Sequence, residues 1–221
     1  MALSIKKLSI GNVEQCLFDD VCFEVSEGEV VTLMGPSGCG KSTLLGAIAG
    51  HLSPIFSLSG SVMLNGYDVL NLAPNKRRIG ILFQDDLLFP HLNIWENLAF
   101  ALPKAITRKN RKKKALETLK RIDLAALAEK MPTEISGGQR ARISLMRMLL
   151  SNPQAVLLDE PFSKLDKVLR NEFRDFVFNQ IKLLNIPALM VTHDDADIPA
   201  GGQVINWSWH NQDKKSGSGS C

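Results

Sequence analysis

The sequence lacks the features of a membrane-spanning, secreted or zinc-binding protein. No stretch reaches the roughly 18 uninterrupted apolar residues that a membrane-spanning helix requires. The N-terminus carries Lys6 and Lys7 after a short apolar start, which is not the order of a secretory signal peptide. The four cysteines form no C-x-x-C pair, so neither a zinc site nor a disulfide framework is predicted. These absences fit a protein of the reducing cytosol.

The sequence also lacks a strong excess of charge of either sign. Its formal net charge of +3 is too small to indicate nucleic-acid binding by itself. The 221 residues are 45% hydrophobic, which is enough for one sizeable α/β core with a small inserted subdomain. The end of the chain, Ser216–Cys221, alternates serine and glycine before a lone thiol. We expect residues 208–221 to form a flexible tail, with an added linker from residue 216.

A glycine-rich loop between a predicted strand and a predicted helix is the most specific feature of the sequence. Val30–Met34 predicts a buried strand, and residues 44–49 predict a helix. The loop matches G-x-x-x-x-G-K-[ST] and consists of Gly35, Pro36, Ser37, Gly38, Cys39, Gly40, Lys41, Ser42 and Thr43. Its glycines let backbone N–H groups approach phosphate oxygens, at the positive end of the helix dipole. The pattern predicts a nucleoside-triphosphate site, with Lys41 on the β- and γ-phosphates and Ser42 on Mg²⁺.

Polar side chains follow three further predicted strands. These apolar strands are expected over residues 78–83, 155–158 and 188–192. In open α/β sheets ligands collect beyond the carboxyl ends of the strands. Asp159 is therefore expected to hold Mg²⁺ through water, and Glu160 to orient and deprotonate the water that attacks the γ-phosphate. Gln84 is placed to touch Mg²⁺ or that water. A lone histidine is more often structural, but His193 has the same position as Gln84 and Glu160, just past the end of a strand, so a functional role is favoured.

The remaining strands are expected to be half-buried or short. Residues 3–10 and 21–25 predict antiparallel strands, residues 59–66 a strand ending in an Asn-Gly turn, and residues 203–207 a last strand. No aromatic residue occurs at positions 11–17 to stack on a nucleotide base. Phe18 and Phe23 are predicted to be core residues.

Between residues 85 and 134 the pattern becomes helical and amphipathic. Helices are expected over residues 94–102 and 115–127, with the basic run Arg108–Lys114 between them. Such a run suggests nucleic acid or lipid headgroups as alternatives. Because it contains no aromatic residues and leads into an amphipathic helix, a solvated face is favoured.

A second anion cradle is expected where the next helix begins. Ser136 is a suitable N-cap, and Gly137, Gly138 and Gln139 follow it at the start of a helix through Leu150. Two cradles in one chain have two explanations. Either both face one nucleotide, or each completes a site on a partner subunit.

The order of these motifs resembles the nucleotide-binding subunits of ATP-binding-cassette (ABC) transporters over residues 1–207. The order is the phosphate loop, Gln84, S-G-G-Q, apolar-D-E-P, S-x-L-D and T-H-D. The resemblance is strongest to short bacterial importer ATPases, such as those of thiamine, iron and sulfate systems, and to an uncharacterised enteric-type member. It implies an α/β phosphate-loop fold with an antiparallel β subdomain and a helical subdomain at residues 85–150, and it implies ATP hydrolysis with Mg²⁺.

The resemblance also implies an assembly. Two chains would pack head to tail, so that Gly35–Thr43 of one faces Ser136–Gln139 of the other across ATP, with Asp166 contacting the opposite subunit. His193 would contact the γ-phosphate. Gln84 and the segment after it would receive a cytoplasmic helix of a membrane permease at the cytoplasmic face of the inner membrane. A periplasmic substrate-binding protein would act indirectly, and no nucleic acid is expected.

The sequence departs from the family pattern in three ways. It lacks the early base-stacking aromatic, it has Lys164 where a small residue is usual, and nothing after Trp207 resembles a C-terminal regulatory domain. Two alternatives remain open, which are an exporter or lipoprotein-release ATPase and a soluble ABC ATPase acting on nucleic acid or ribosomes. The basic run Arg108–Lys114 is the one feature that supports the last.

Overall fold

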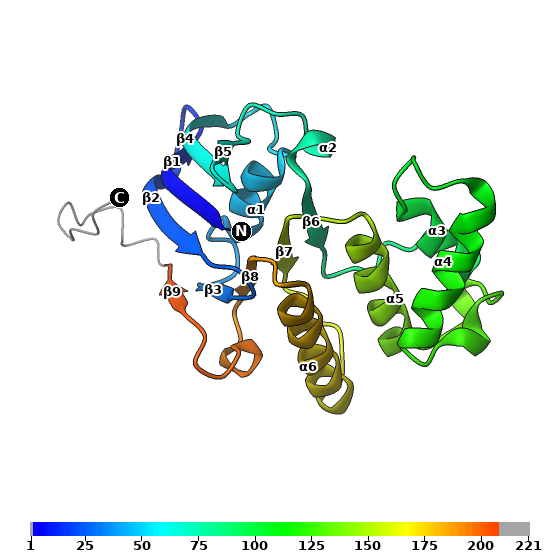
Figure 1. The fold of residues 1–221 in the computed structure, drawn as a ribbon. Coiled ribbons are helices and arrows are strands. Elements are labelled where there is room, and N and C mark those ends of the chain that lie inside the picture. Colours follow the sequence, from blue (N-terminus) through cyan, green and yellow to red (C-terminus); the bar gives the residue numbers. More distant parts are fainter. Residues whose placement is uncertain (1, 208–221) are drawn as a thin grey trace. The chain divides into compact units, whose positions relative to one another are not determined.

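The computed structural model describes residues 2–207, which cluster into two units (Figure 1). The sheet unit contains the described residues up to 81 together with 154–160 and 178–207, and the helical unit contains residues 82–153 and 161–177. The predicted tail at 208–221 lies outside the described residues. In the described part of the chain, no helix is both long and apolar enough to span a membrane.

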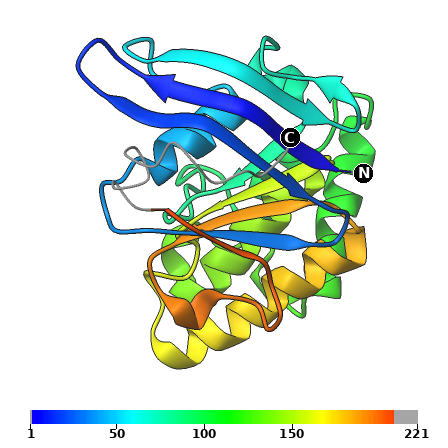
Figure 2. The same cartoon turned by 90° about the vertical axis from the view of Figure 1, so that its left-hand side faces the viewer.

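A five-stranded parallel sheet forms the base of the sheet unit (Figures 1 and 2). Its order is β6-β7-β8-β3-β9, and the strands are β3 Val30–Met34, β6 Ile79–Leu82, β7 Ala155–Asp159, β8 Ala188–Thr192 and β9 Val204–Asn206. The middle strands are runs of buried apolar residues, because both faces of a parallel sheet are covered. All five occur where the apolar runs predict them, and the predicted α/β fold class is confirmed.

A second, antiparallel sheet has the order β2-β1-β4-β5 (Figure 2). Its strands are β1 Leu3–Gly11, β2 Cys16–Val25, β4 Ser57–Leu64 and β5 Tyr67–Asp68. Asn65 and Gly66 both have positive φ, at 53° and 83°, as the predicted Asn-Gly turn requires. Cys16 is exposed and Cys39 is buried, and neither is in a disulfide, whereas Cys22 is disulfide-bonded, which the cysteine spacing did not predict.

The core of the sheet unit lies between its two sheets and α1 Lys41–Ala49. Phe18 is fully buried there, with its ring centroid 4.6 Å from that of Trp207, and Phe23 packs against the same core. Both phenylalanines are core residues as predicted. The end of α1 is capped by a buried arginine on α2 Pro74–Arg77. Arg77 Nη1 donates to the carbonyl oxygens of Ala47 and Ile48 at 2.7 and 2.8 Å, which satisfies carbonyls that a helix end leaves unpaired.

The helical unit contains three α-helices and the part of a fourth that runs to Val177. They are α3 Ile94–Ala101, α4 Arg108–Arg121, α5 Gly137–Leu150 and α6 Lys167–Leu184, with short 3-10 turns at Ala125–Leu127 and Pro132–Glu134; a third such turn, Asp195–Asp197, belongs to the sheet unit. Asn93 caps α3 in a capping box with Glu96, and Ser136 caps α5 in another with Gln139. These boxes place the helix starts where the sequence predicts them.

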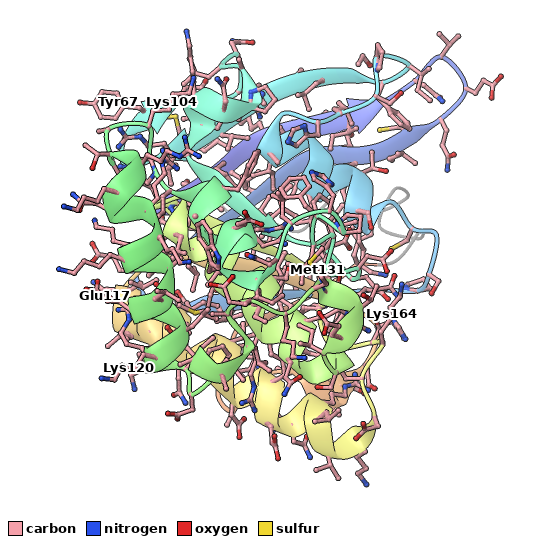
Figure 3. The ribbon with its side chains drawn as sticks, turned by 90° about the vertical axis from the view of Figure 1, so that its right-hand side faces the viewer. Tyr67, Lys104, Glu117, Lys120, Met131 and Lys164 are labelled. Carbon is pink, nitrogen blue, oxygen red and sulfur yellow. The ribbon has the colours of Figure 1, made fainter. Side chains whose placement is uncertain are left out.

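The basic run Arg108–Lys114 is the first half of α4, and so the predicted boundary at residue 115 is wrong. Lysine and arginine are good helix formers, and Arg111 ties the run to the end of α3 through bonds to the carbonyl oxygens of Ala99 (2.8 Å) and Leu102 (2.9 Å). Lys112 pairs with Glu129 at 3.0 Å and lies over the Trp95 ring. Figure 3 shows many of the remaining side chains of α4 extending away from the helix. Part of the run thus serves packing within the unit.

Candidate nucleotide-binding site

The glycine-rich loop between β3 and α1 has a backbone that only glycine adopts readily. Gly38 and Gly40 have φ values of 84° and 88°, in the left-handed region. A Cβ at Gly40 would also lie 3.1 Å from the Phe18 ring, and one at Gly35 would lie 2.6 Å from the Trp207 carbonyl oxygen. The pattern glycines therefore shape the loop, which opens the N-terminus of α1 toward an anion.

Lys41 is folded into the loop that precedes it. Lys41 is only 5% exposed, and its Nζ donates to the carbonyl oxygens of Gly35 at 2.6 Å and Pro36 at 2.9 Å. The ammonium group is thus held at the mouth of the phosphate loop. Phosphate oxygens arriving at the loop would meet a positive charge already in position.

Ser42 and Asp159 meet although 117 residues separate them in the sequence. The Ser42 hydroxyl donates to Asp159 Oδ1 at 3.0 Å, because α1 begins beside the carboxyl end of β7. A hydroxyl and a carboxylate are hard oxygen donors of the kind that Mg²⁺ prefers, with substrate phosphates completing its shell. The described residues hold no cluster of three or more His, Cys, Asp or Glu side chains suited to a metal.

Burial raises the pKa of Asp159, and the nearby Glu160 charge adds to this, while the Ser42 hydrogen bond and Lys41 oppose it. The folded protein therefore holds a carboxylate whose charge is poorly solvated. A cation bound there would relieve this cost. The site is thus arranged for a positive ligand.

Glu160 and His193 form a second pair at the ends of neighbouring strands. β7 and β8 are adjacent, and Glu160 N donates to the Val191 carbonyl at 3.0 Å, which fixes the backbone beyond β7. His193 Nδ1 lies 3.1 Å from Glu160 Oε1. Glu160 has a φ of 44°, in the left-handed region, as do eight other described residues that carry a side chain. This backbone conformation turns the chain out of β7 at the predicted general base.

The turn after β8 is held by a buried acid that sequence reasoning missed. Thr192 Oγ1 donates to Asp197 Oδ2 at 2.6 Å and accepts from Asp194 N at 3.1 Å. Both Thr192 and Asp197 are buried. This network fixes the turn that carries His193. No spacing rule applied to the sequence singled out Asp197.

The other predicted site residues lie in the helical unit. Gln84 is exposed two residues beyond β6, and Asp166 caps α6 by accepting from the backbone N–H groups of Val168 and Leu169, both at 3.1 Å. The N-terminal turn of α5 contains Gly137, Gly138 and Gln139 after its N-cap Ser136, which accepts from Gln139 N at 3.3 Å. Their roles toward ATP stay predictions. The structure describes each within its own unit.

The segment after Gln84 is fixed by α5, which the sequence did not reveal. The side-chain carboxylate of Asp86 accepts from Arg140 Nε at 2.8 Å. The backbone carbonyl oxygen of Asp86 accepts from the Ser144 hydroxyl at 2.7 Å. Arg147 donates to the Leu87 carbonyl at 2.9 Å. Arg140, Ser144 and Arg147 recur at helical spacing, so one face of α5 holds this segment.

Comparison with known proteins decides the family. Residues 18–163 match the family model described as ABC transporter. The chain belongs to the ABC transporter family. It is 44% identical over 209 residues to the uncharacterized ABC transporter ATP-binding protein YnjD of Escherichia coli, which covers 93% of this chain and 96% of YnjD.

Two further ABC relatives are named as importers. The chain is 41% identical to a spermidine/putrescine import ATP-binding protein, PotA of Thermotoga maritima, and 39% identical to a sulfate/thiosulfate import ATP-binding protein, CysA of Burkholderia mallei. These matches cover 86% and 89% of this chain but only 53% and 57% of the relatives' lengths. The predicted identity as an ABC ATP-binding protein is confirmed. With it, the predicted ATPase activity and ATP binding of this family are confirmed.

Replacing Asp159 with asparagine is expected to stabilise the ABC protein when no nucleotide is bound. A pKa raised by folding means that the native state binds the proton more tightly, so stability falls as pH rises through the window between the unfolded and folded pKa values. Asparagine keeps an oxygen for Ser42 without the charge. We expect Asp159→Asn to show a higher Tm than wild type at pH 7, and the difference to shrink as the pH is lowered toward about 4. Thermal unfolding followed by circular dichroism at both pH values tests this, and a lower Tm at pH 7 would contradict it.

Proposed function

We propose that the chain is the ATP-hydrolysing motor subunit of a bacterial ABC importer. One observation carries the proposal. Two functional pairs, Ser42–Asp159 and Glu160–His193, stand at the carboxyl end of the parallel sheet into which the phosphate loop is built. This is where a phosphate, a divalent cation and an attacking water need their partners.

ATP binds with its phosphates on the loop Gly35–Thr43. Lys41 exchanges the carbonyl oxygens of Gly35 and Pro36 for the β- and γ-phosphate oxygens, which are stronger partners because they are charged. Ser42 and Gln84 would hold Mg²⁺ through their side-chain oxygens, and Asp159 would hold it through water. A bound Mg²⁺ would neutralise charge on the phosphates.

Hydrolysis uses the groups beyond the strand ends. Glu160 orients the attacking water and accepts its proton, and His193 holds the Glu160 carboxylate in place through the 3.1 Å contact while contacting the γ-phosphate. Gln84 contributes a further oxygen to the water or to Mg²⁺.

Two copies complete the sites of one another. In the proposed head-to-tail dimer, Ser136–Gln139 at the start of α5 offers backbone N–H groups and a positive helix end to the ATP of the partner chain. Asp166 lies in the loop that contacts the opposite subunit. ATP then stabilises the closed dimer, and hydrolysis removes that stabilisation and reopens it.

The transport partner is proposed from the relatives. PotA and CysA are named as import ATP-binding proteins, and both align with most of this chain. The chain would act at the cytoplasmic face of the inner membrane, with the segment after Gln84 receiving a cytoplasmic helix of a permease. A periplasmic binding protein would take part indirectly.

A pull-down tests the partnership. The Glu160→Gln variant, with ATP, is used as bait on detergent-solubilised membranes of the source organism, and bound proteins are identified by mass spectrometry. The Lys41→Ala variant is the matched control, because it should not bind ATP and therefore should not form the closed dimer. We expect a multi-spanning permease only with the first bait, accompanied in an importer by a periplasmic binding protein. Recovery of ribosomal or DNA-associated proteins without a permease would overturn the transport proposal.

A further inference from the structure

Lys164, which stands where the family usually has a small residue, makes an ion pair with Asp85 (Lys164 is labelled in Figure 3). Asp85 directly follows Gln84, and Lys164 lies in the loop Ser163–Asp166. Both residues belong to the helical unit, although 79 positions separate them. The pair thus links two segments to which the proposed function gives separate tasks.

The ion pair contributes little to the stability of the fold. The side chains of Lys164 and Asp85 are 52% and 64% exposed, and ion pairs this accessible to water add little to folding stability. The consequence of the contact is therefore geometric. It selects one arrangement of two exposed segments.

Both segments are anchored beside the pair. On one side, Asp86 is held by Arg140 and Ser144 of α5. On the other, Asp166 caps α6, and Phe162 is fully buried with its ring edge-on to Phe173. Because both segments are anchored, an ion pair between them restrains the residues adjacent to Lys164 and Asp85.

Charge pairing explains why Lys164 selects Asp85. Four charged side chains, Asp85, Asp86, Arg140 and Lys164, line one cavity of about 180 Å³ together with Gln84. Arg140 already occupies the Asp86 carboxylate at 2.8 Å. Of the two carboxylates in the cavity wall, Asp85 is therefore the one that pairs with Lys164. The charges of the Arg140–Asp86 and Lys164–Asp85 pairs cancel.

We propose that Lys164 is a positioning residue that fixes Gln84 relative to the loop Ser163–Asp166. The inference rests on the proposed function, in which Gln84 serves the hydrolysis site and Asp166 contacts the partner chain. Formation of the dimer contact at Asp166 is then transmitted through Lys164 and Asp85 to the neighbouring Gln84. The pair acts on turnover and leaves ATP binding to the phosphate loop.

A double-mutant cycle on ATP hydrolysis by the full chain tests this role. Lys164→Ala and Asp85→Ala are each expected to lower kcat by about three- to fivefold, the range that an exposed pair allows, with KM for ATP unchanged. The double alanine variant should be no worse than either single variant. Exchanging the charges, in Lys164→Asp with Asp85→Lys, should restore kcat to within about twofold of wild type.

Two controls separate positioning from general effects. Lys130 forms a comparable exposed pair with Glu134 at 3.0 Å in the same unit, and Lys130→Ala should leave kcat unchanged. The ratio of wild-type to Lys164→Ala turnover should approach one in 1 M NaCl, where the screening length is only about 3 Å.

The outcomes are distinguishable from failure of the proposed function. Additive effects of the two alanine substitutions, or unchanged kcat in both, would overturn the positioning role, provided that Glu160→Gln loses hydrolysis in the same assay. If Glu160→Gln hydrolyses ATP at the wild-type rate, the proposed hydrolysis site is wrong, and the inference falls with it.

Discussion

Replacing Lys41 with alanine is expected to weaken ATP binding at least about 100-fold, because the substitution removes charge-assisted hydrogen bonds to phosphate worth about 1.5–3 kcal/mol each. The Lys41 ammonium already sits within the phosphate loop, bound to the carbonyl oxygens of Gly35 and Pro36. Alanine leaves those carbonyls facing the incoming phosphates, so repulsion replaces attraction. Isothermal titration calorimetry with Mg²⁺-ATP measures the loss.

Lys76→Ala is the matched control for Lys41→Ala. Lys76 is an exposed lysine of the sheet unit, in α2. Its replacement removes one positive charge without touching the loop and should leave the affinity for ATP within about twofold, because exposed charges at a distance are screened. If Lys41→Ala also stays within twofold of wild type, the loop is not the nucleotide site.

Replacing Glu160 with glutamine is expected to lower kcat by about 10²–10⁴-fold, the contribution typical of a positioned general base, while ATP binding persists. Glutamine adopts the backbone φ of 44° as readily as glutamate does, so the turn after β7 is retained. Its side-chain oxygen can still accept from His193 Nδ1, which lies 3.1 Å from the present carboxylate oxygen. What is lost is the ability to take a proton from water.

Steady-state phosphate release measures the effect of Glu160→Gln. Glu24→Gln, an exposed glutamate in β2 of the same unit, removes an equal charge and should keep the wild-type rate. A rate for Glu160→Gln within about threefold of wild type would remove Glu160 from the role of general base, since such a loss lies far below that expected for one.

Local patterns predicted most of the secondary structure. The buried strands Val30–Met34 and Ala188–Thr192 are continuous apolar runs and occur at those bounds. Ser136 caps α5 with Gln139 in a box that the spacing of the two residues makes recognisable. Each of these signals lies within a few consecutive residues, so it can be recognised in the sequence without knowledge of the fold.

Contacts between residues far apart in the sequence could not be predicted, because no local pattern relates the two partners. Asp86 and Arg140 are 54 positions apart, and Asp85 and Lys164 are 79 apart. The start of α4 was also misplaced, since the basic run Arg108–Lys114 contains no apolar residues to show a helical period although its residues favour helix. The strand-end rule did predict that Asp159, Glu160 and His193 would gather, because parallel strands end at one edge.

The site also shows why the adenine partner was hard to predict. The hairpin between β1 and β2 carries Val13 at its exposed tip rather than an aromatic residue. The rings of Phe18 and Trp207 pack on one another with their centroids 4.6 Å apart, and Phe18 is buried. Phe18 therefore supports the loop from within the core, as the contact to Gly40 indicates.

The central claim is that ATP joins two copies of this chain through the phosphate loop of one and Ser136–Gln139 of the other. The most direct test is the molar mass of Glu160→Gln by size-exclusion chromatography with light scattering, with and without saturating ATP. The account predicts a mass of 24.4 kDa without ATP and twice that value with it, and no such change for Lys41→Ala. A Glu160→Gln variant that binds ATP by calorimetry yet stays at the monomer mass would contradict it.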